Sequence, residues 1–262
     1  MYDFEFVRPK NLSDAKSALT SGDAQVLAGG QTLLTTMKQR LASPDRLVSL
    51  SAIEELQGIE RTRGTIRVGG MTPHAVVAKD LATDYPALAS LASRIGDPAV
   101  RTRGTIGGSL ANNDPAACYP AAVLASGATV VTDRRSISAD DFFDGLFTTA
   151  LDEGELITAV EFPVPGSASY QKFVQPASRF AMVGVFVARF ADAVRVAITG
   201  ASSDGVFRWT DAENRLTSDF SSNALDGADL GSVEMLSDIH ADADYRQNLV
   251  RVLTERAVAS IA

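Results

Sequence analysis

The sequence predicts an α+β protein with a small α/β lobe, a larger α+β lobe and a C-terminal α+β domain. Strand-like runs alternate with segments whose apolar residues recur at helical spacing, which indicates mixed secondary structure. A Pro, Gly and Ser-rich stretch, "PVPGSAS" at 163–169, is typical of a linker. Two strand-like runs and an amphipathic segment follow it, so the chain beyond 169 is expected to form a unit of its own.

The first lobe is predicted to contain a strand, a glycine loop and a helix in that order. "LSDAKSAL" is helical in pattern, with Ser13 as the expected N-cap, and "AQVLAGG" (24–30) is typical of a strand that runs into a glycine turn. "QTLLTTMKQRLA" follows with apolar residues at helical spacing, among them Leu33 and Met37.

The second lobe begins with "TIRVGG" (65–70), which is typical of a strand. Thr72 is the expected N-cap of the next helix, because Pro73 suits a first helical position. "YPALASLASRIG" (85–96) is predicted to be helical, 101–116 a loop, and "DPAACYPAAVLASG" (114–127) a helix capped by Asp114. Two strand-like runs, "ATVVT" and "ELITAVEF", complete this lobe.

Beyond the linker, "MVGVFVARF" and "AVRVAITG" are predicted to be two strands joined by a short turn. The polar stretch 203–232 has no clear assignment. The chain is predicted to end in an amphipathic helix, with Tyr245, Leu249, Val252 and Leu253 on one face.

Length and composition are those of an ordinary globular protein. The chain has 262 residues, 45% of them hydrophobic and 21% charged, which allows one large domain or two to three small ones. No apolar run approaches the ~20 residues that a membrane-spanning helix needs. The first residues carry charges throughout and lack the apolar core of a secretory signal, so we expect a cytoplasmic protein.

Charge and cysteine content exclude several kinds of site. The 24 basic and 32 acidic residues give 24 − 32 = −8, which disfavours nucleic acid as a general partner. Cys118 is the single cysteine and His74 and His240 are the only histidines, so an internal disulfide is excluded and a zinc or iron–sulfur site within this chain is not expected. Metal chemistry would therefore belong to a partner.

Two similar glycine pairs are the strongest motif. "AGGQT" (28–32) and "TIGGS" (105–109) each place Gly-Gly before a polar residue. Glycine lets backbone N–H groups approach a ligand closely and permits the positive φ that aims neighbouring amides at one anion, so two such stretches suit a diphosphate. Each could equally be a plain turn. The chain lacks the G-x-G-x-x-G, P-loop and G-x-S-x-G motifs, which disfavours a Rossmann site, a P-loop and a hydrolase.

Other polar residues have ordinary explanations. Asp114 before Pro115 is a common helix cap, and Cys118 suits a small packing position. His74 is expected in a solvated helix and His240 in a loop. Lys172 is expected to be an exposed charge on a strand.

Four stretches together resemble a known family: "LAGGQTLLTTMKQRLASPDRLVSL", "VGGMTPHA", "RTRGTIGGSLANNDPAACYPAA" and "YQKFVQPASRFAMVGV". They are similar to the FAD-binding medium subunit of the molybdenum hydroxylases, the xanthine dehydrogenase and aerobic carbon monoxide dehydrogenase family. The resemblance implies the FAD-binding fold of the vanillyl-alcohol oxidase and p-cresol methylhydroxylase type, in lobes 1–55 and 56–165. It also implies a C-terminal α+β domain, 170–262, of the carbon monoxide dehydrogenase flavoprotein type.

The resemblance further implies non-covalent FAD between the two lobes, with no catalytic side chain and no metal ligand in this chain. The residues expected around FAD are Leu27, Ala28, Gly29, Gly30, Gln31, Thr32, Leu33, Thr72, Thr105, Ile106, Gly107, Gly108, Ser109, Asn113, Asp114, Lys172 and Phe180. Thr32 and Ser109 would add hydroxyl donors, and Asn113 and Asp114 would bond the flavin or ribityl side. Phe180 stands where many relatives have tyrosine, so the ring contact could persist without the hydroxyl. Cys118 stands where relatives often have Ala or Asp.

The implied function is electron transfer within a complex. A large molybdopterin subunit would oxidise the substrate, a small subunit with two [2Fe-2S] clusters would relay single electrons, and FAD would pass them to oxygen, NAD or a quinone. The resemblance also suggests a dimer of heterotrimers. Two alternatives stay open: a stand-alone flavoprotein oxidase of the same fold, and a non-catalytic binding or assembly protein.

Overall fold

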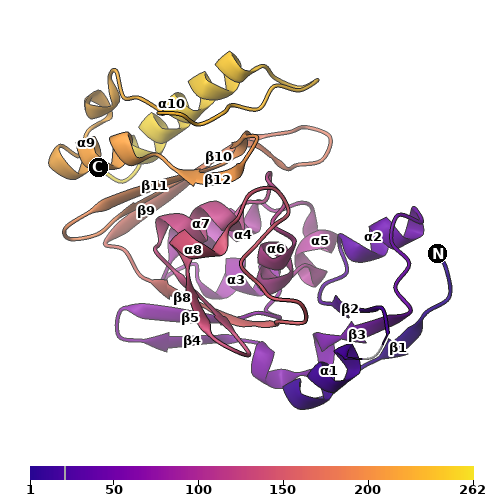
Figure 1. Ribbon diagram of the computed structural model, residues 1–262. Coiled ribbons are helices and arrows are strands. Elements are labelled where there is room, and N and C mark those ends of the chain that lie inside the picture. Colours follow the sequence, from indigo (N-terminus) through magenta and orange to yellow (C-terminus); the bar gives the residue numbers. More distant parts are fainter. Residues whose placement is uncertain (21) are drawn as a thin grey trace.

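The computed structural model describes residues 1–20 and 22–262, and its strands form three sheets that follow one another along the chain (Figure 1). The strands are β1 (Glu5–Val7), β2 (Ala24–Leu27), β3 (Arg46–Ser49), β4 (Ile59–Thr62), β5 (Thr65–Gly69), β6 (Thr129–Thr132), β7 (Ser136–Ser138), β8 (Ile157–Pro163), β9 (Ser167–Val174), β10 (Ala181–Arg189), β11 (Val194–Ser202) and β12 (Gly205–Arg208). The α-helices are α1 (Leu12–Leu19), α2 (Leu33–Lys38), α3 (His74–Asp80), α4 (Pro86–Ser93), α5 (Pro98–Arg103), α6 (Ile106–Asn112), α7 (Tyr119–Ala125), α8 (Ala139–Phe142), α9 (Thr210–Ser218) and α10 (Ala243–Ala259). Short 3-10 helices lie at Leu50–Ala52, Glu54–Leu56 and Ser222–Leu225.

The first sheet is parallel, in the order β1-β3-β2, so its strands all end at the same edge. The glycine loop that follows β2 therefore lies at the carboxyl edge of this sheet, where it leads into α2. Helix α1 is capped by Asn11, whose side chain accepts from the Asp14 N–H at 2.8 Å, and not by Ser13 as the sequence predicted. Asparagine is as good an N-cap as serine, so the two could not be separated by residue type.

The second sheet is antiparallel, in the order β4-β5-β8-β6-β7, and α3, α4, α6 and α7 pack beside it (Figure 1). The stretch 101–116, predicted to be a loop, instead contains the end of α5 and all of α6. Thr105 caps α6 by accepting from the Gly108 N–H at 3.1 Å. A Thr cap offsets the low helix propensity of the two glycines that follow.

Two further helix starts differ from prediction. Helix α3 begins at His74 with Pro73 in the capping position, and the Thr72 hydroxyl bonds the backbone of Gly58 instead. Helix α7 begins at Tyr119, because Asp114 caps only a local turn by accepting from the Ala116 N–H at 2.9 Å.

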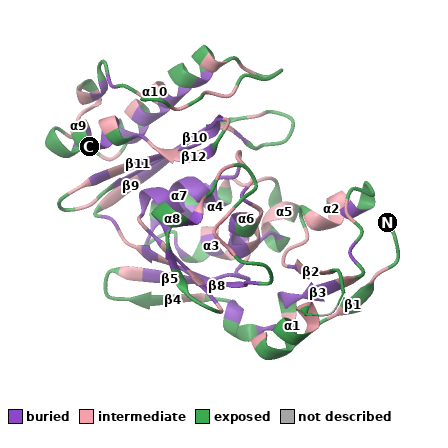
Figure 2. Ribbon diagram, in the orientation of Figure 1, coloured by how far each residue is buried: buried purple, intermediate pink, exposed green. Residues whose placement is uncertain are grey.

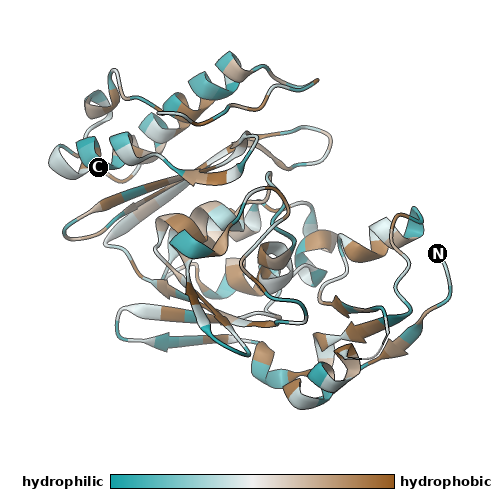
Figure 3. Cartoon of the chain, viewed as in Figure 1, coloured by the Kyte–Doolittle hydropathy of each residue, from teal (hydrophilic) through white to brown (hydrophobic). Residues whose placement is uncertain are grey.

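The third sheet is antiparallel, in the order β12-β11-β10-β9, and is covered on both faces. Helices α9 and α10 cover one face of this sheet, and α4 and α7, which also pack beside the second sheet, lie against the other face. Strands β10 and β11 are therefore buried almost throughout (Figure 2). These long strands carry brown, hydrophobic segments in Figure 3. The stretch 203–232, unassigned from sequence, supplies β12 and α9.

The predicted linker is short, since only 164–166 separate β8 from β9. Tyr85, at the start of α4, joins the second and third sheets: its ring packs edge-on against Phe162 of β8 at 6.3 Å and Phe186 of β10 at 6.2 Å between ring centres. Residues of the second and third sheets therefore share one hydrophobic core. Among the described residues, no helix is both long and apolar enough to span a membrane.

Candidate cofactor-binding site

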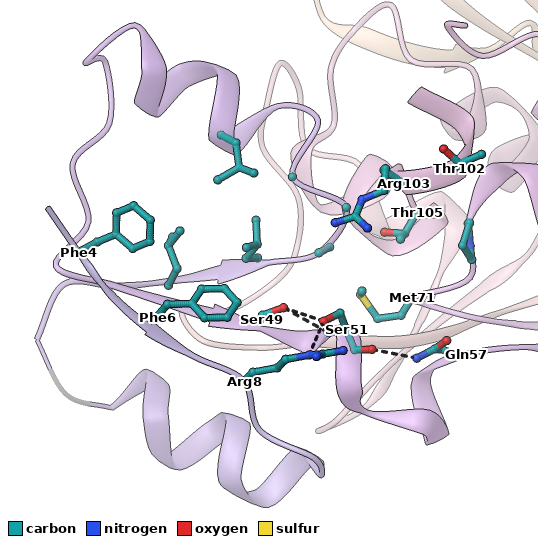
Figure 4. A pocket seen from close by; sticks show the side chains of 17 residues that line it. Phe4, Phe6, Arg8, Ser49, Ser51, Gln57, Met71, Thr102, Arg103 and Thr105 are labelled. Carbon is teal, nitrogen blue, oxygen red and sulfur yellow. Dashed lines mark hydrogen bonds between the residues drawn. The ribbon is translucent and has the colours of Figure 1, made fainter. Parts of the chain in front are cut away.

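Two cavities meet at the first glycine pair. The N-terminal cavity, of about 710 Å³, lies between the first sheet and the segments 57–73 and 102–105. Figure 4 shows its side chains, among them Phe6, Arg8 and Arg103. The central cavity, of about 640 Å³, is lined by the glycine loop, α6 and the turn between β9 and β10. Both volumes lie in the ~300–1,000 Å³ range of small-molecule sites. The two cavities share Ala28, Gly29, Gly30 and Thr105.

The first glycine pair presents unpaired backbone donors. Within residues 1–20 and 22–262, no hydrogen bond uses the backbone N–H of Gly29, Gly30, Gln31 or Thr32 as donor. Gly30 has a φ of 71°, the left-handed conformation that glycine adopts freely. Unpaired amides are costly unless water or a ligand satisfies them, and successive amides in such a turn suit an anion.

Glycine is needed at position 29 because of close packing between two loops. A Cβ on Gly29 would lie 2.2 Å from the carbonyl oxygen of Arg103, so the two loops touch backbone to backbone. This contact brings the first glycine pair against the segment that leads into α6.

The second glycine pair differs from the sequence prediction, because its amides already have partners. The N–H of Gly107 donates to the Gly70 carbonyl at 2.8 Å, that of Gly108 to the Thr105 hydroxyl, and that of Ile106 to the Thr72 carbonyl. A Cβ on Gly107 would lie 2.6 Å from the Gly70 oxygen. Gly107 is thus a packing glycine, and only Gly108 lines the central cavity.

Most of the predicted site residues lie together. The central cavity is lined by Ala28, Gly29, Gly30, Gln31, Thr32, Leu33, Thr105, Gly108, Ser109, Asp114, Lys172 and Phe180, and the N-terminal cavity by Leu27. Four predicted residues do not line either cavity: Thr72, Ile106, Gly107 and Asn113.

Asn113 shapes the wall rather than facing the cavity. Its buried side-chain amide donates to the carbonyls of Gly145 at 2.9 Å and Thr148 at 2.8 Å. Asn113 has a φ of 40° and ends α6, which turns the chain toward Asp114 on the cavity surface. The contact of Asn113 with flavin that the resemblance implied is therefore not one that this geometry favours.

Lys172 is buried, with 6% of its surface exposed, contrary to the prediction of an exposed charge. Its Nζ lies 2.6 Å from the Arg179 carbonyl, 3.0 Å from the Arg94 carbonyl and 3.3 Å from Cys118 Sγ. The Arg94 guanidinium in turn donates to the carbonyls of Tyr170 and Lys172. These bonds tie strand β9 to the end of α4 and to the turn that carries Phe180.

That turn is tight and holds Phe180 at the cavity mouth. The Gln175 N–H donates to the Phe180 carbonyl at 2.9 Å and the Arg179 N–H to the Gln175 carbonyl at 2.8 Å. Arg179 has a φ of 61°, and Phe180 is 46% exposed. The Phe180 ring is thus free to cover a ligand in the central cavity.

His74 was also placed wrongly by sequence. It is 4% exposed, lines the central cavity and contacts the Tyr119 ring at 5.3 Å between ring centres. Burial, and secondarily the charge of Arg101, lowers the pKa of His74 to about 4, so the imidazole is neutral near pH 7.

Several wall residues lie in or next to the motif stretches but were not predicted, because the motifs do not show which side chains face the cavity. Gln25, Thr36, Ile95, Val100 and Ser178 are examples. Gly96 offered a local signal, since a glycine before an Asp-Pro helix start is a typical turn; its φ is 50°.

The residues present fit FAD: unpaired amides for a diphosphate, hydroxyls of Thr32 and Ser109 beside them, and Phe180 and buried Lys172 at another part of the same cavity. A comparison with protein families supports FAD as the cofactor, because residues 2–165 match the family described as the FAD binding domain in molybdopterin dehydrogenase. The chain belongs to this family.

Its relatives are medium subunits of molybdenum hydroxylases. The chain is 35% identical to the nicotine 6-hydroxylase medium subunit of Paenarthrobacter nicotinovorans, over 97% of this chain and 95% of the relative. It is 32% identical to the carbon monoxide dehydrogenase medium chain of Hydrogenophaga pseudoflava, over 97% and 96%. The solved structure of quinoline 2-oxidoreductase from Pseudomonas putida 86 covers 99% of this chain and 96% of its own, with a TM-score of 0.90 and 29% identity. The chain is an FAD-binding oxidoreductase subunit of this kind.

Proposed function

We propose that this chain binds FAD non-covalently and serves as the electron outlet of a molybdenum hydroxylase complex. The observation that carries the proposal is the row of unpaired amides at residues 29–32, set at the junction of two cavities. A diphosphate would satisfy these donors, at roughly 1.5–3 kcal/mol for each hydrogen bond to a charged group.

FAD supplies the ability to take up electrons one at a time and release them in pairs. The role of the chain is to bind and orient it. Thr32 and Ser109 would donate their hydroxyls to the diphosphate, and Asp114 would face the ribityl side. The buried Lys172 would place positive charge beside the ring system, and Phe180 would exclude water from it.

The proposed partners are a large molybdopterin-binding subunit, which oxidises the substrate, and a small subunit with [2Fe-2S] clusters, which delivers electrons. The relatives support this, since they are named as medium subunits or medium chains. We further propose a cytoplasmic dimer of heterotrimers with oxygen, NAD or a quinone as the terminal acceptor.

The test uses Gly108→Val in the co-expressed complex. A Cβ at Gly108 would lie 3.2 Å from the Ala28 Cβ and 3.0 Å from the Thr105 hydroxyl, so the larger valine would reach into the central cavity. The variant complex should lack FAD and still bleach its iron–sulfur absorbance when substrate is added without oxygen, but fail to turn over with the acceptor. An FAD-free complex that turns over at the wild-type rate would show that the outlet lies elsewhere.

A further inference from the structure

Cys118 and Lys172 form a buried nucleophilic pair in the wall of the central cavity. Both residues line the cavity, at 5% and 6% exposure, and the distance between Sγ and Nζ is 3.3 Å. The Tyr170 hydroxyl is buried beside them and has no hydrogen-bond partner in the described part of the chain. Burial, and then the nearby Cys118, raises the pKa of Tyr170 well above its usual range, so it stays a neutral phenol.

The pair accounts for a buried amine without a carboxylate. Among the ion pairs of residues 1–20 and 22–262, none includes Lys172, and its other two contacts are backbone carbonyls. Cys118 Sγ is the third polar atom within reach of Nζ, so the amine and the thiol are held in contact in the wall of the cavity.

We propose that Cys118 and Lys172 are an oxidation-sensitive pair that hydrogen peroxide joins covalently. Peroxide first oxidises the thiol to a sulfenic acid and is reduced to water. The Lys172 amine then attacks the sulfenic sulfur: an S–N bond forms, the S–O bond breaks, and the hydroxyl leaves as water with a proton from nitrogen. In sum, one thiol, one amine and one peroxide give one sulfenamide and two waters.

The product would change the cavity. It would bond the Lys172 nitrogen to sulfur and fix strand β9 to the start of α7, next to the turn that carries Phe180. If the proposed function holds, the cross-link lies at the flavin end of the site, and a thiol reductant would reverse it. The chemistry itself requires only this chain and peroxide.

The experiment treats the purified chain with hydrogen peroxide, removes the excess with catalase, alkylates remaining thiols and digests the protein for mass spectrometry. Because Cys118 is the single cysteine, every thiol measurement reports on it alone. We expect a linked peptide pair that contains Cys118 and Lys172 and has two hydrogens fewer than the sum of its parts. Dithiothreitol should restore both free peptides. FAD content is not part of this readout, so failure of the cross-link and failure of the proposed function are distinguishable.

Matched variants separate the pair from general oxidation. Lys172→Met should lose the link and accumulate sulfenic acid that dimedone labels, whereas Lys79→Met, the same change at an exposed lysine, should cross-link like wild type. Should Lys172→Met fail to fold, the wild-type digest still decides. A thiol that resists peroxide, or that ends as sulfinic acid in wild type without any link to Lys172, would overturn the proposal.

Discussion

The adjacent glycines of α6 allow a matched pair of substitutions, one expected to lower stability and the other to weaken FAD binding. Gly107→Ala and Gly108→Ala add the same single methyl group one residue apart in the same helix. At Gly107 the methyl would lie 2.6 Å from the Gly70 carbonyl oxygen, which is backbone of the second unit. At Gly108 it would lie 3.0 Å from the Thr105 hydroxyl and 3.2 Å from the Ala28 methyl, within the cavity wall.

The magnitudes follow from these contacts. Alanine gains about 1 kcal/mol over glycine within a helix. At Gly107 this gain is outweighed by overpacking of roughly 1–3 kcal/mol and by loss of the hydrogen bond to Gly70, worth about 1 kcal/mol. We therefore expect Gly107→Ala to lower the free energy of unfolding by about 1–3 kcal/mol. Gly108→Ala should stay within about 1 kcal/mol of wild type yet weaken FAD binding by about tenfold, or about 1.4 kcal/mol.

Urea denaturation of the FAD-free chain gives the stability change, and quenching of flavin fluorescence on titration gives the affinity. We expect the larger stability loss at Gly107 and, of the two folded variants, the larger affinity loss at Gly108. Wild-type FAD affinity in Gly108→Ala, or equal stability of Gly107→Ala and Gly108→Ala, would contradict these assignments.

Three further predictions follow. The pKa of His74 is lowered from 6.5 to about 4, so the unfolded state takes up a proton at a higher pH than the folded state does. The free energy of unfolding should therefore fall by about 3 kcal/mol as the pH drops from 6.5 to 4. Urea titrations at several pH values should show a smaller pH dependence in His74→Gln and the wild-type dependence in His240→Gln. Acid precipitation should leave the flavin in the supernatant, since the site offers hydrogen bonds, and yellow colour in the pellet would contradict non-covalent binding. Co-expression with the molybdopterin and iron–sulfur subunits should give one peak in size-exclusion chromatography at micromolar concentration, whereas separate elution of the three chains would contradict the proposed assembly.

Sequence predicted the architecture well where periodicity and turn chemistry were strong. The strands at 24–27 and 65–69, the two long strands after the linker and the terminal helix all lie near their expected positions. The α+β class and the family are confirmed. The division at 1–55, 56–165 and 170–262 stays a prediction, although the strands of each sheet fall within or close to one of these ranges.

Several of the errors depended on contacts between segments that lie far apart in the sequence. The glycines at 107 and 108 suggested a loop, but a Thr105 cap and the close approach of Gly70 make a helix there. Lys172 looked exposed by strand alternation, yet carbonyls from two other segments bury it. The local sequence pattern carries no information on partners from other segments. It therefore predicted which residues lie around the cavity better than it predicted what each residue does there.

The most direct test of the central claim compares binding of FAD and riboflavin to the flavin-free chain by isothermal titration calorimetry. Riboflavin keeps the ring system and lacks the diphosphate that the amides of residues 29–32 would bind. Losing two hydrogen bonds of roughly 1.5–3 kcal/mol each should weaken binding by about two to four orders of magnitude. We expect one FAD per chain, with riboflavin weaker by at least about a hundredfold. Equal affinity for the two, or no FAD binding at all, would contradict FAD binding through these amides.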